Sequence, residues 1–108
     1  MNILIVEDDP AQRELLARVL QRAGHAVTAA GDVAQAITAR GPFDLVFCDW
    51  DLNPGTARDV RAAWVSVPFV VLSGYEKPPG WDTAWIMKPI STEGLVGLVE
   101  AAMKEGRT

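Results

Sequence analysis

Cysteine is almost absent from this chain, since Cys48 is the only one among 108 residues. A single thiol can form neither an internal disulfide nor a thiolate metal cluster. Histidine is equally scarce, since His25 is the only one. It therefore has no histidine or cysteine partner at metal-ligand spacing. We interpret Cys48, which follows an apolar run, as a filler of the core rather than as a reactive thiol.

Long apolar runs and a surplus of basic residues are also missing. No run approaches the roughly 20 apolar residues that a membrane-spanning helix needs, and the first residues lack the features of a signal peptide. Lys and Arg total 10 against 14 Asp and Glu, so the net charge is −4 and repels nucleic acid and anionic membranes. We therefore expect a cytoplasmic protein that binds neither nucleic acid nor membrane directly.

The sequence does contain the alternating strand and helix patterns of one domain, which we assign to residues 1–108. Apolar residues make up 49% of the chain, enough for a core at this length. Short apolar runs are typical of strands that are buried on both faces of a parallel sheet. Such runs occur at 3–6, 43–48 and 67–72, with weaker ones at 26–30 and 84–87.

Helical patterns separate these runs. The first helix is expected between an Asp9 cap and Gly24, the second between an Asp32 cap and Gly41. A third covers about 56–64, and the last begins at Ser91. The residues expected to face inward are Leu15, Leu16, Val19, Leu20 and Ala23 in the first helix, Val33, Ala36 and Ile37 in the second, and Leu95, Leu98, Val99 and Ala102 in the last.

The stretch 74–82 interrupts the alternation. Pro78, Pro79 and Gly80 would break a helix in its middle, so we expect a loop or a single turn there. Strands and helices otherwise alternate, and a helix follows the fifth strand. This order predicts an α/β domain whose parallel sheet lies between helices.

Polar side chains follow the apolar runs, where the carboxyl ends of parallel strands form the working edge of such a sheet. The first run ends in Glu7, Asp8 and Asp9, the third in Asp49 with Asp51 close behind, the fourth in Ser73 and the fifth in Lys88. Asp9 is best explained as the helix cap. We expect the others to meet at one edge of the sheet.

Carboxylates that are packed together repel one another, and a hard divalent cation relieves the repulsion. Mg²⁺ accepts one or two carboxylates, keeps several waters and bridges to phosphate. A carboxylate beside such a cation can attack phosphorus and form an aspartyl phosphate. Lys88 would neutralise charge on the moving phosphoryl group, and Ser73 would donate a hydrogen bond to it. These residues predict Mg²⁺-dependent phosphoryl transfer to a carboxylate.

Taken together, these motifs resemble the receiver domains of two-component response regulators. The similarity rests on four segments in the right order and spacing, and it covers essentially the whole chain except residues 74–84. The segments are Ile-Leu-Ile-Val-Glu-Asp-Asp-Pro at 3–10, Cys-Asp-Trp-Asp at 48–51, Val-Val-Leu-Ser-Gly at 70–74 and Met-Lys-Pro at 87–89. The resemblance implies a doubly wound, flavodoxin-like parallel sheet of five strands in the order 2-1-3-4-5. Its fourth helix would be missing or reduced to a turn.

The resemblance also implies roles for individual residues. Asp49 would be the phosphoacceptor, Asp8 and Asp49 Mg²⁺ ligands, Glu7 a ligand through water and Asp51 a ligand through its backbone carbonyl. Ser73 would be the switch hydroxyl, Lys88 the charge partner of the phosphoryl group and Trp85 the switch aromatic. Asp51 and Tyr75 would tune dephosphorylation.

The partners follow from the same resemblance. A histidine kinase or a histidine phosphotransfer protein would donate the phosphoryl group, and an unidentified protein would receive the signal. Asn53 stands where many members have proline, and Ala57 where glycine is usual. The Ser-Gly-Tyr sequence at 73–75 and the missing helix are similar to a subgroup of stand-alone receivers.

Two other functions are compatible with the sequence. Asp49-Trp50-Asp51 is an Asp-x-Asp motif, as in Mg²⁺-dependent phosphohydrolases of the haloacid-dehalogenase type, although those have it at the first strand of a larger chain. A receiver-shaped scaffold could also work without phosphate, but it would not need the whole acidic set. We expect instead a binding module that is no enzyme toward other substrates and catalyses only its own phosphorylation and dephosphorylation.

Overall fold

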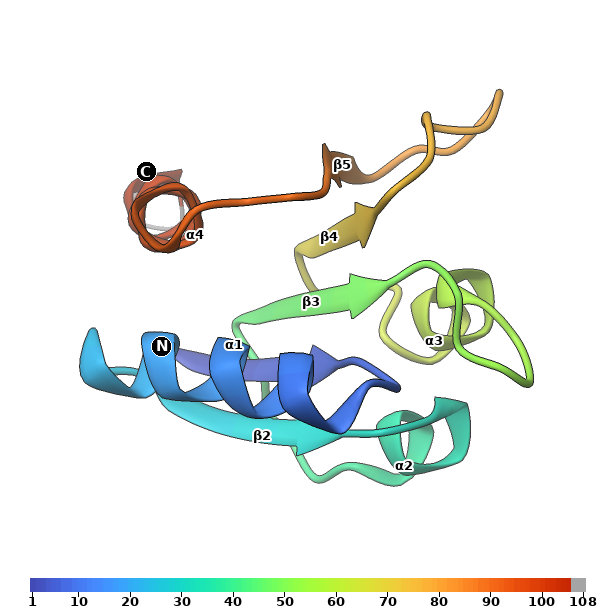
Figure 1. Cartoon of the computed structure of the whole chain (residues 1–108). Coiled ribbons are helices and arrows are strands. Elements are labelled where there is room, and N and C mark those ends of the chain that lie inside the picture. Colours follow the sequence, from blue (N-terminus) through green and yellow to red (C-terminus); the bar gives the residue numbers. More distant parts are fainter. Residues whose placement is uncertain (106–108) are drawn as a thin grey trace.

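Five parallel strands form the centre of the molecule (Figure 1). The computed structural model describes residues 1–105. The strands are β1 (Asn2–Val6), β2 (Ala26–Ala30), β3 (Leu45–Asp49), β4 (Phe69–Ser73) and β5 (Ala84–Met87). They pair in the order β2-β1-β3-β4-β5, and each neighbouring pair is parallel. The flavodoxin-like sheet that the sequence predicts is therefore confirmed.

The bounds of β3 and β4 differ slightly from the predicted ranges 43–48 and 67–72. Both strands begin two residues later and end one residue later. Pro68 has no N–H to donate to the ladder, so β4 begins at Phe69, although the Pro68 carbonyl still accepts from Val46 N at 2.9 Å. As a consequence, Asp49 and Ser73 are the last residues of their strands rather than the first residues of the loops.

Helices cover both faces of the sheet. Helices α1 (Pro10–Arg22) and α4 (Thr92–Glu105) share one apolar cluster with Ile3 and Ile5 of β1. Helices α2 (Val33–Thr38) and α3 (Ala57–Ala63) share the other with Leu4 and Val6. Figure 1 shows α1 beside β1 and β2, with α4 next to it. None of the helices in the described part of the chain is long and apolar enough to cross a membrane.

The helix starts follow from capping residues. The Asp9 carboxylate accepts from Ala11 N at 2.9 Å and precedes Pro10, as predicted. Asp32 accepts from Gln35 N at 2.7 Å, and the Ser91 hydroxyl accepts from Gly94 N at 2.9 Å. Gly24, which follows α1, has a φ of +97°, a left-handed conformation that glycine adopts at little cost.

Some of the predicted inward residues are exposed. Leu15 is 59% exposed, and Ala23 and Ile37 also face solvent, so these three predictions are wrong. Of the apolar residues predicted to face inward on α1, only Leu16, Val19 and Leu20 are buried or half-buried. Helix α2 ends at Thr38, well before Gly41, so it has too few turns for a full apolar face. The inward residues predicted for the last helix are all buried or half-buried.

A cluster of three tryptophans, Trp50, Trp81 and Trp85, stands where a helix between β4 and β5 would lie. Residues 74–83 contain no helix, as predicted. Trp81 is only 7% exposed and belongs to the apolar cluster that includes α2 and α3. Its ring centroid lies 5.1 Å from that of Trp50 and 6.5 Å from that of Phe69. This tryptophan cluster therefore covers part of the sheet in place of a helix.

Candidate functional site at the carboxyl ends of the strands

Three carboxylates meet at the carboxyl ends of β1 and β3. Glu7 and Asp8 follow β1, and the Glu7 N–H continues the ladder by donating to Ala30 O at 3.1 Å. Asp49 closes β3 and pairs with Leu72 of β4. One oxygen from each of Glu7, Asp8 and Asp49 lies within 4.8 Å of the other two. The structure thus brings together the acidic residues that the strand ends indicated.

Lys88 joins this group from the end of β5, the edge strand beside β4. It follows β5, and its backbone N–H donates to Ser73 O at 2.7 Å. Its Nζ lies 3.2 Å from Glu7 Oε2 and 3.3 Å from Asp49 Oδ1. One ammonium therefore bridges two carboxylates that come from different strand ends.

Burial sets the ionisation of this group. The Glu7 side chain is 3% exposed and that of Asp49 13%. Burial, followed by repulsion from Asp49, raises the pKa of Glu7 above its usual range. Burial also raises the pKa of Asp49, because it outweighs the attraction of Lys88. The pKa of Lys88 is raised as well, since attraction to Asp49 and Glu7 exceeds the effect of burial that would lower it.

The charge balance favours a bound cation. Three carboxylates face a single ammonium, and the raised pKa values of Glu7 and Asp49 mean that their negative charges are poorly compensated. Oxygen ligands of this kind suit a hard divalent ion such as Mg²⁺, which also keeps waters on its open side. Asp8 is exposed, so that side is accessible from solvent. The residues present therefore fit Mg²⁺.

The raised pKa values lead to a prediction for the metal-free protein. A carboxyl group whose pKa is higher in the folded state stabilises that state below its ordinary pKa and loses this contribution as the pH rises through the raised value. Asp49→Asn removes one of the two poorly compensated charges. At pH 7 without Mg²⁺, we expect the free energy of unfolding of this variant to exceed that of the wild type by on the order of 1 kcal/mol.

The difference should vanish below about pH 4, where the carboxyl groups are protonated in the unfolded chain as well. Urea titrations at a series of pH values measure it. A variant that is less stable than wild type at pH 7 would show that Lys88 already compensates Asp49 fully.

Ser73 is buried at the end of β4. Its hydroxyl oxygen accepts from Tyr75 N at 3.1 Å, and its carbonyl accepts from Lys88 N. Trp85 is half-buried in the tryptophan cluster and donates its indole N–H to Tyr75 O at 2.8 Å. The backbone of Tyr75 is therefore bonded on both sides, to Ser73 and to Trp85. The switch roles of Ser73 and Trp85 stay predictions.

Asp51 and Tyr75 are exposed and do not belong to the carboxylate group. Asp51 is exposed in the loop after β3, where it forms an isolated antiparallel bridge with Thr56. It is not a member of the carboxylate group formed by Glu7, Asp8 and Asp49. Tyr75 is 65% exposed. Their roles in tuning dephosphorylation, and that of the Asp51 carbonyl toward Mg²⁺, stay predictions.

Sequence reasoning missed one residue that supports the site. Arg13 of α1 donates from Nη1 to Glu7 O at 2.9 Å. A cation near the N-terminal, positive end of a helix is electrostatically unfavourable, and this placement was the available signal. Trp81, which is buried in the core, packs the segment between β4 and β5 against the sheet. Cys48 is buried in the core as predicted, and burial raises the pKa of its thiol.

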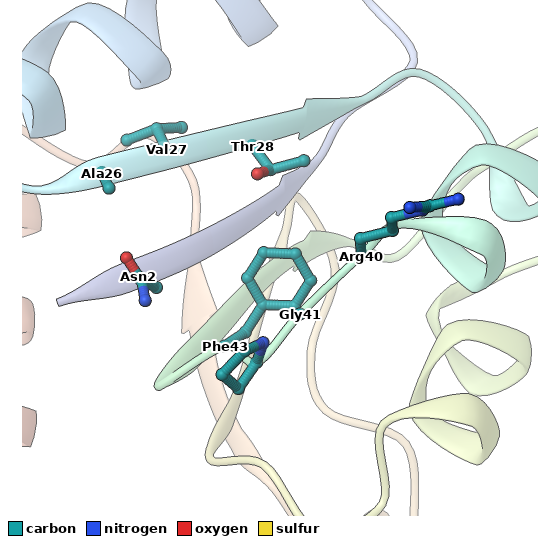
Figure 2. A pocket seen from close by; sticks show the side chains of 8 residues that line it. Asn2, Ala26, Val27, Thr28, Arg40, Gly41 and Phe43 are labelled. Carbon is teal, nitrogen blue, oxygen red and sulfur yellow. The ribbon is translucent and has the colours of Figure 1, made fainter.

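A hollow at the opposite ends of the strands lacks this chemistry. It lies beside the starts of β1 and β2 and the segment 40–43, because α2 ends at Thr38 and leaves this part of the sheet open (Figure 2). Among its lining residues only Arg40 is charged, and Figure 2 shows that side chain extending away from Phe43. The acidic edge is therefore the better candidate for a functional site.

Comparisons with known proteins point the same way. A family model described as response regulator receiver domain matches residues 3–100. The N-terminal domain of a response regulator/sensory box/GGDEF protein from Carboxydothermus hydrogenoformans is 26% identical, with a TM-score of 0.85 over 99% of this chain and 97% of that one. The receiver domain of the hybrid histidine kinase CckA is 28% identical, with a TM-score of 0.78 over 95% of this chain and 99% of that one.

The response regulator TrrA from Thermotoga maritima, solved in complex with Mg²⁺-BeF, shares the fold at 24% identity and a TM-score of 0.81, over 94% of this chain and 97% of that one. No curated protein matches this chain.

Proposed function

The chain belongs to the family of response regulator receiver domains, and from this premise we propose that Asp49 accepts a phosphoryl group in a Mg²⁺-dependent reaction. The donor would be a phosphohistidine on a histidine kinase or a histidine phosphotransfer protein. The observation that carries the proposal is the Lys88 ammonium, which lies within 3.3 Å of oxygens of both Glu7 and Asp49. It provides a positive charge where the phosphoryl oxygens would arrive.

Asp49 is the best nucleophile of the three carboxylates. It combines contact with Lys88 with a side chain that is still partly exposed. Glu7 has the same contact but is almost fully buried, so phosphorus cannot approach it in line. Asp8 is exposed, but among the ion pairs of residues 1–105 none joins it to Lys88. Asp8 and Glu7 are therefore better suited to hold the cation, Asp8 directly and Glu7 through water.

In the proposed step an Asp49 carboxylate oxygen forms a bond to phosphorus while the P–N bond to the donor imidazole breaks. The electron pair of that bond stays on the imidazole nitrogen. Mg²⁺, when bound, would neutralise charge on the phosphoryl oxygens. Lys88 holds a proton throughout, because its pKa is raised, and would offer this charge to the phosphoryl oxygens. Ser73 would turn its hydroxyl group away from Tyr75 N and donate a hydrogen bond to a phosphoryl oxygen.

The surface beside Lys88 suits a protein donor. A hollow lies between α1 and the turn after β5, and it reaches Lys88 itself. Leu15, Leu16 and Ile90 line it, and Leu15 is one of the most exposed large apolar residues. An apolar side chain of this size at the rim of a charged site fits a docking surface better than a small-molecule pocket.

The response to phosphorylation would be a change in protein contacts. Ser73 and Trp85 are both bonded to the backbone of Tyr75, so movement of Ser73 toward a phosphoryl group would disturb the segment 74–83. A downstream protein would read this segment. Asp51, exposed in the loop after β3, and Tyr75, exposed near the start of this segment, would set the access of water to the phosphoryl group.

The chain would act on no other substrate and would catalyse only its own phosphorylation and dephosphorylation. Incubation with a small phosphodonor such as acetyl phosphate and with Mg²⁺ should add one phosphoryl group per chain, detected by intact-protein mass spectrometry. A chelator should abolish the addition. Phosphotransfer from a panel of radiolabelled histidine kinases then identifies the donor.

Two results would contradict the proposal. Addition that proceeds equally in the chelator excludes the metal requirement. Steady turnover of p-nitrophenyl phosphate, lost in Asp51→Asn, would indicate an Asp-x-Asp phosphohydrolase instead.

A further inference from the structure

The peptide that links Glu7 to Asp8 is held by a residue outside the carboxylate group. Arg13, on the first turns of α1, is half-buried and donates from Nη1 to Glu7 O at 2.9 Å. On the other side of the same residue, Glu7 N donates to Ala30 O at 3.1 Å. Both backbone groups of Glu7 are therefore fixed, one by β2 and one by Arg13.

Gly31 makes room for this contact. A Cβ atom at Gly31 would lie 2.9 Å from Arg13 Nη1, closer than a Cβ comes to another atom, so the end of the Arg13 side chain would have to shift. The backbone of Gly31 does not itself require glycine, because the glycines with positive φ in the described chain are Gly24, Gly55 and Gly80. A side chain at position 31 would therefore displace the guanidinium of Arg13 rather than strain the backbone.

We infer that Arg13 is a positioning residue for the divalent cation, and that Gly31 serves it by leaving space for the guanidinium. The carbonyl of Glu7 belongs to the same peptide plane as the N–H of Asp8. Holding that carbonyl fixes the direction in which the Asp8 carboxylate leaves the backbone. The inference rests on the proposed function, because it concerns the affinity of the metal site described there.

The expected size of the effect follows from other metal sites, where loss of a group that orients a ligand weakens metal binding about 10- to 100-fold. Arg13 acts through a backbone carbonyl, so we expect the lower end of this range. Arg13→Ala and Gly31→Ala should each raise the dissociation constant for Mg²⁺ about 10-fold. Arg13→Lys, which keeps a donor on a long side chain, should recover part of the loss.

The decisive comparison is the double variant. If Gly31 matters only because it accommodates Arg13, adding Gly31→Ala to Arg13→Ala should weaken Mg²⁺ binding no further. Contacting residues that act through one interaction show this non-additivity, whereas independent sites add. Titration with MgCl₂, followed by tryptophan fluorescence to which Trp50 next to Asp49 contributes, measures the wild type, the two single variants and the double variant.

Two controls separate positioning from folding. Gly97→Ala lies on α4, where a Cβ meets nothing within 4 Å, and it should leave the Mg²⁺ affinity unchanged. Urea titrations without Mg²⁺ establish that each variant is folded at the temperature of the binding experiment. Should Arg13→Ala fail to fold, Gly31→Ala and Arg13→Lys still carry the comparison, because both retain a cation at position 13.

The outcomes distinguish the two proposals. A wild-type protein that binds no Mg²⁺ overturns both the proposed function and this inference. A wild-type protein that binds Mg²⁺, with an Arg13→Ala variant that binds it equally well, overturns only the role of Arg13. Additive losses in the double variant would show that Gly31 acts independently of Arg13 and would overturn that part of the inference.

Discussion

Asp49→Asn should take up no phosphoryl group from acetyl phosphate and Mg²⁺, whereas the wild-type protein should gain one. The amide has no carboxylate oxygen to attack phosphorus, and neither neighbouring carboxylate can replace it. Glu7 is buried and paired with Lys88, and Asp8 lacks that pairing among the ion pairs of the described residues. Intact-protein mass spectrometry measures the uptake directly.

Asp82→Asn is the matched control for this variant. It makes the same chemical change at an exposed aspartate, whose nearest cation is Arg61 at 3.9 Å between Nη2 and Oδ2. Because Asp82 is 74% exposed, its side of this long ion pair is solvated and contributes little to stability. The control protein should be phosphorylated like wild type. Equal labelling of Asp49→Asn and wild type would mean that another residue is the acceptor.

Trp81→Ala should lower the free energy of unfolding by about 3 kcal/mol, a large part of the stability of a domain this small. Trp81 is 7% exposed and packs against Trp50, Phe69 and Trp85. Arg58, on α3, lies over its ring, with Cζ 5.6 Å from the centroid. Truncation would open a cavity over the part of the sheet that the tryptophan cluster covers in place of a helix.

Tyr75→Ala provides the matched control, since it removes another aromatic ring from the same segment at a site that is 65% exposed. We expect this variant to stay within about 0.5 kcal/mol of wild type. Urea titrations followed by circular dichroism measure both variants. If Trp81→Ala is as mild as Tyr75→Ala, the tryptophan cluster does not take the place of the missing helix.

Most of the fold could be predicted from the sequence because its signals are local. Runs such as Ile3–Val6 indicate strands that are buried on both faces, and Asp9 with Pro10 indicates where a helix begins. The exposure of Leu15 and the early end of α2 at Thr38 could not be predicted. Those depend on how closely each helix lies against the sheet, which is set by packing between segments far apart in the chain.

The site shows the same division. Glu7, Asp8, Asp49 and Lys88 could be expected to meet, because parallel strands bring their carboxyl ends to one edge. Their distances and raised pKa values depend on burial, which the sequence does not give. Arg13 and Gly31 could not be paired in advance, because one lies on α1 and the other follows β2. The deep burial of Trp81 could not be predicted, because it lies in a loop whose composition gives no sign of a buried residue.

The most direct test of the central claim is to locate the phosphoryl group. Borohydride reduces an acyl phosphate on aspartate to the alcohol, homoserine, and peptide mass spectrometry then identifies the converted position. After treatment with acetyl phosphate and Mg²⁺, the account predicts homoserine at position 49, none at positions 8 or 51, and no 2-amino-5-hydroxypentanoic acid, the product from glutamate, at position 7. Conversion at Asp8 or Asp51 with Asp49 intact would contradict it.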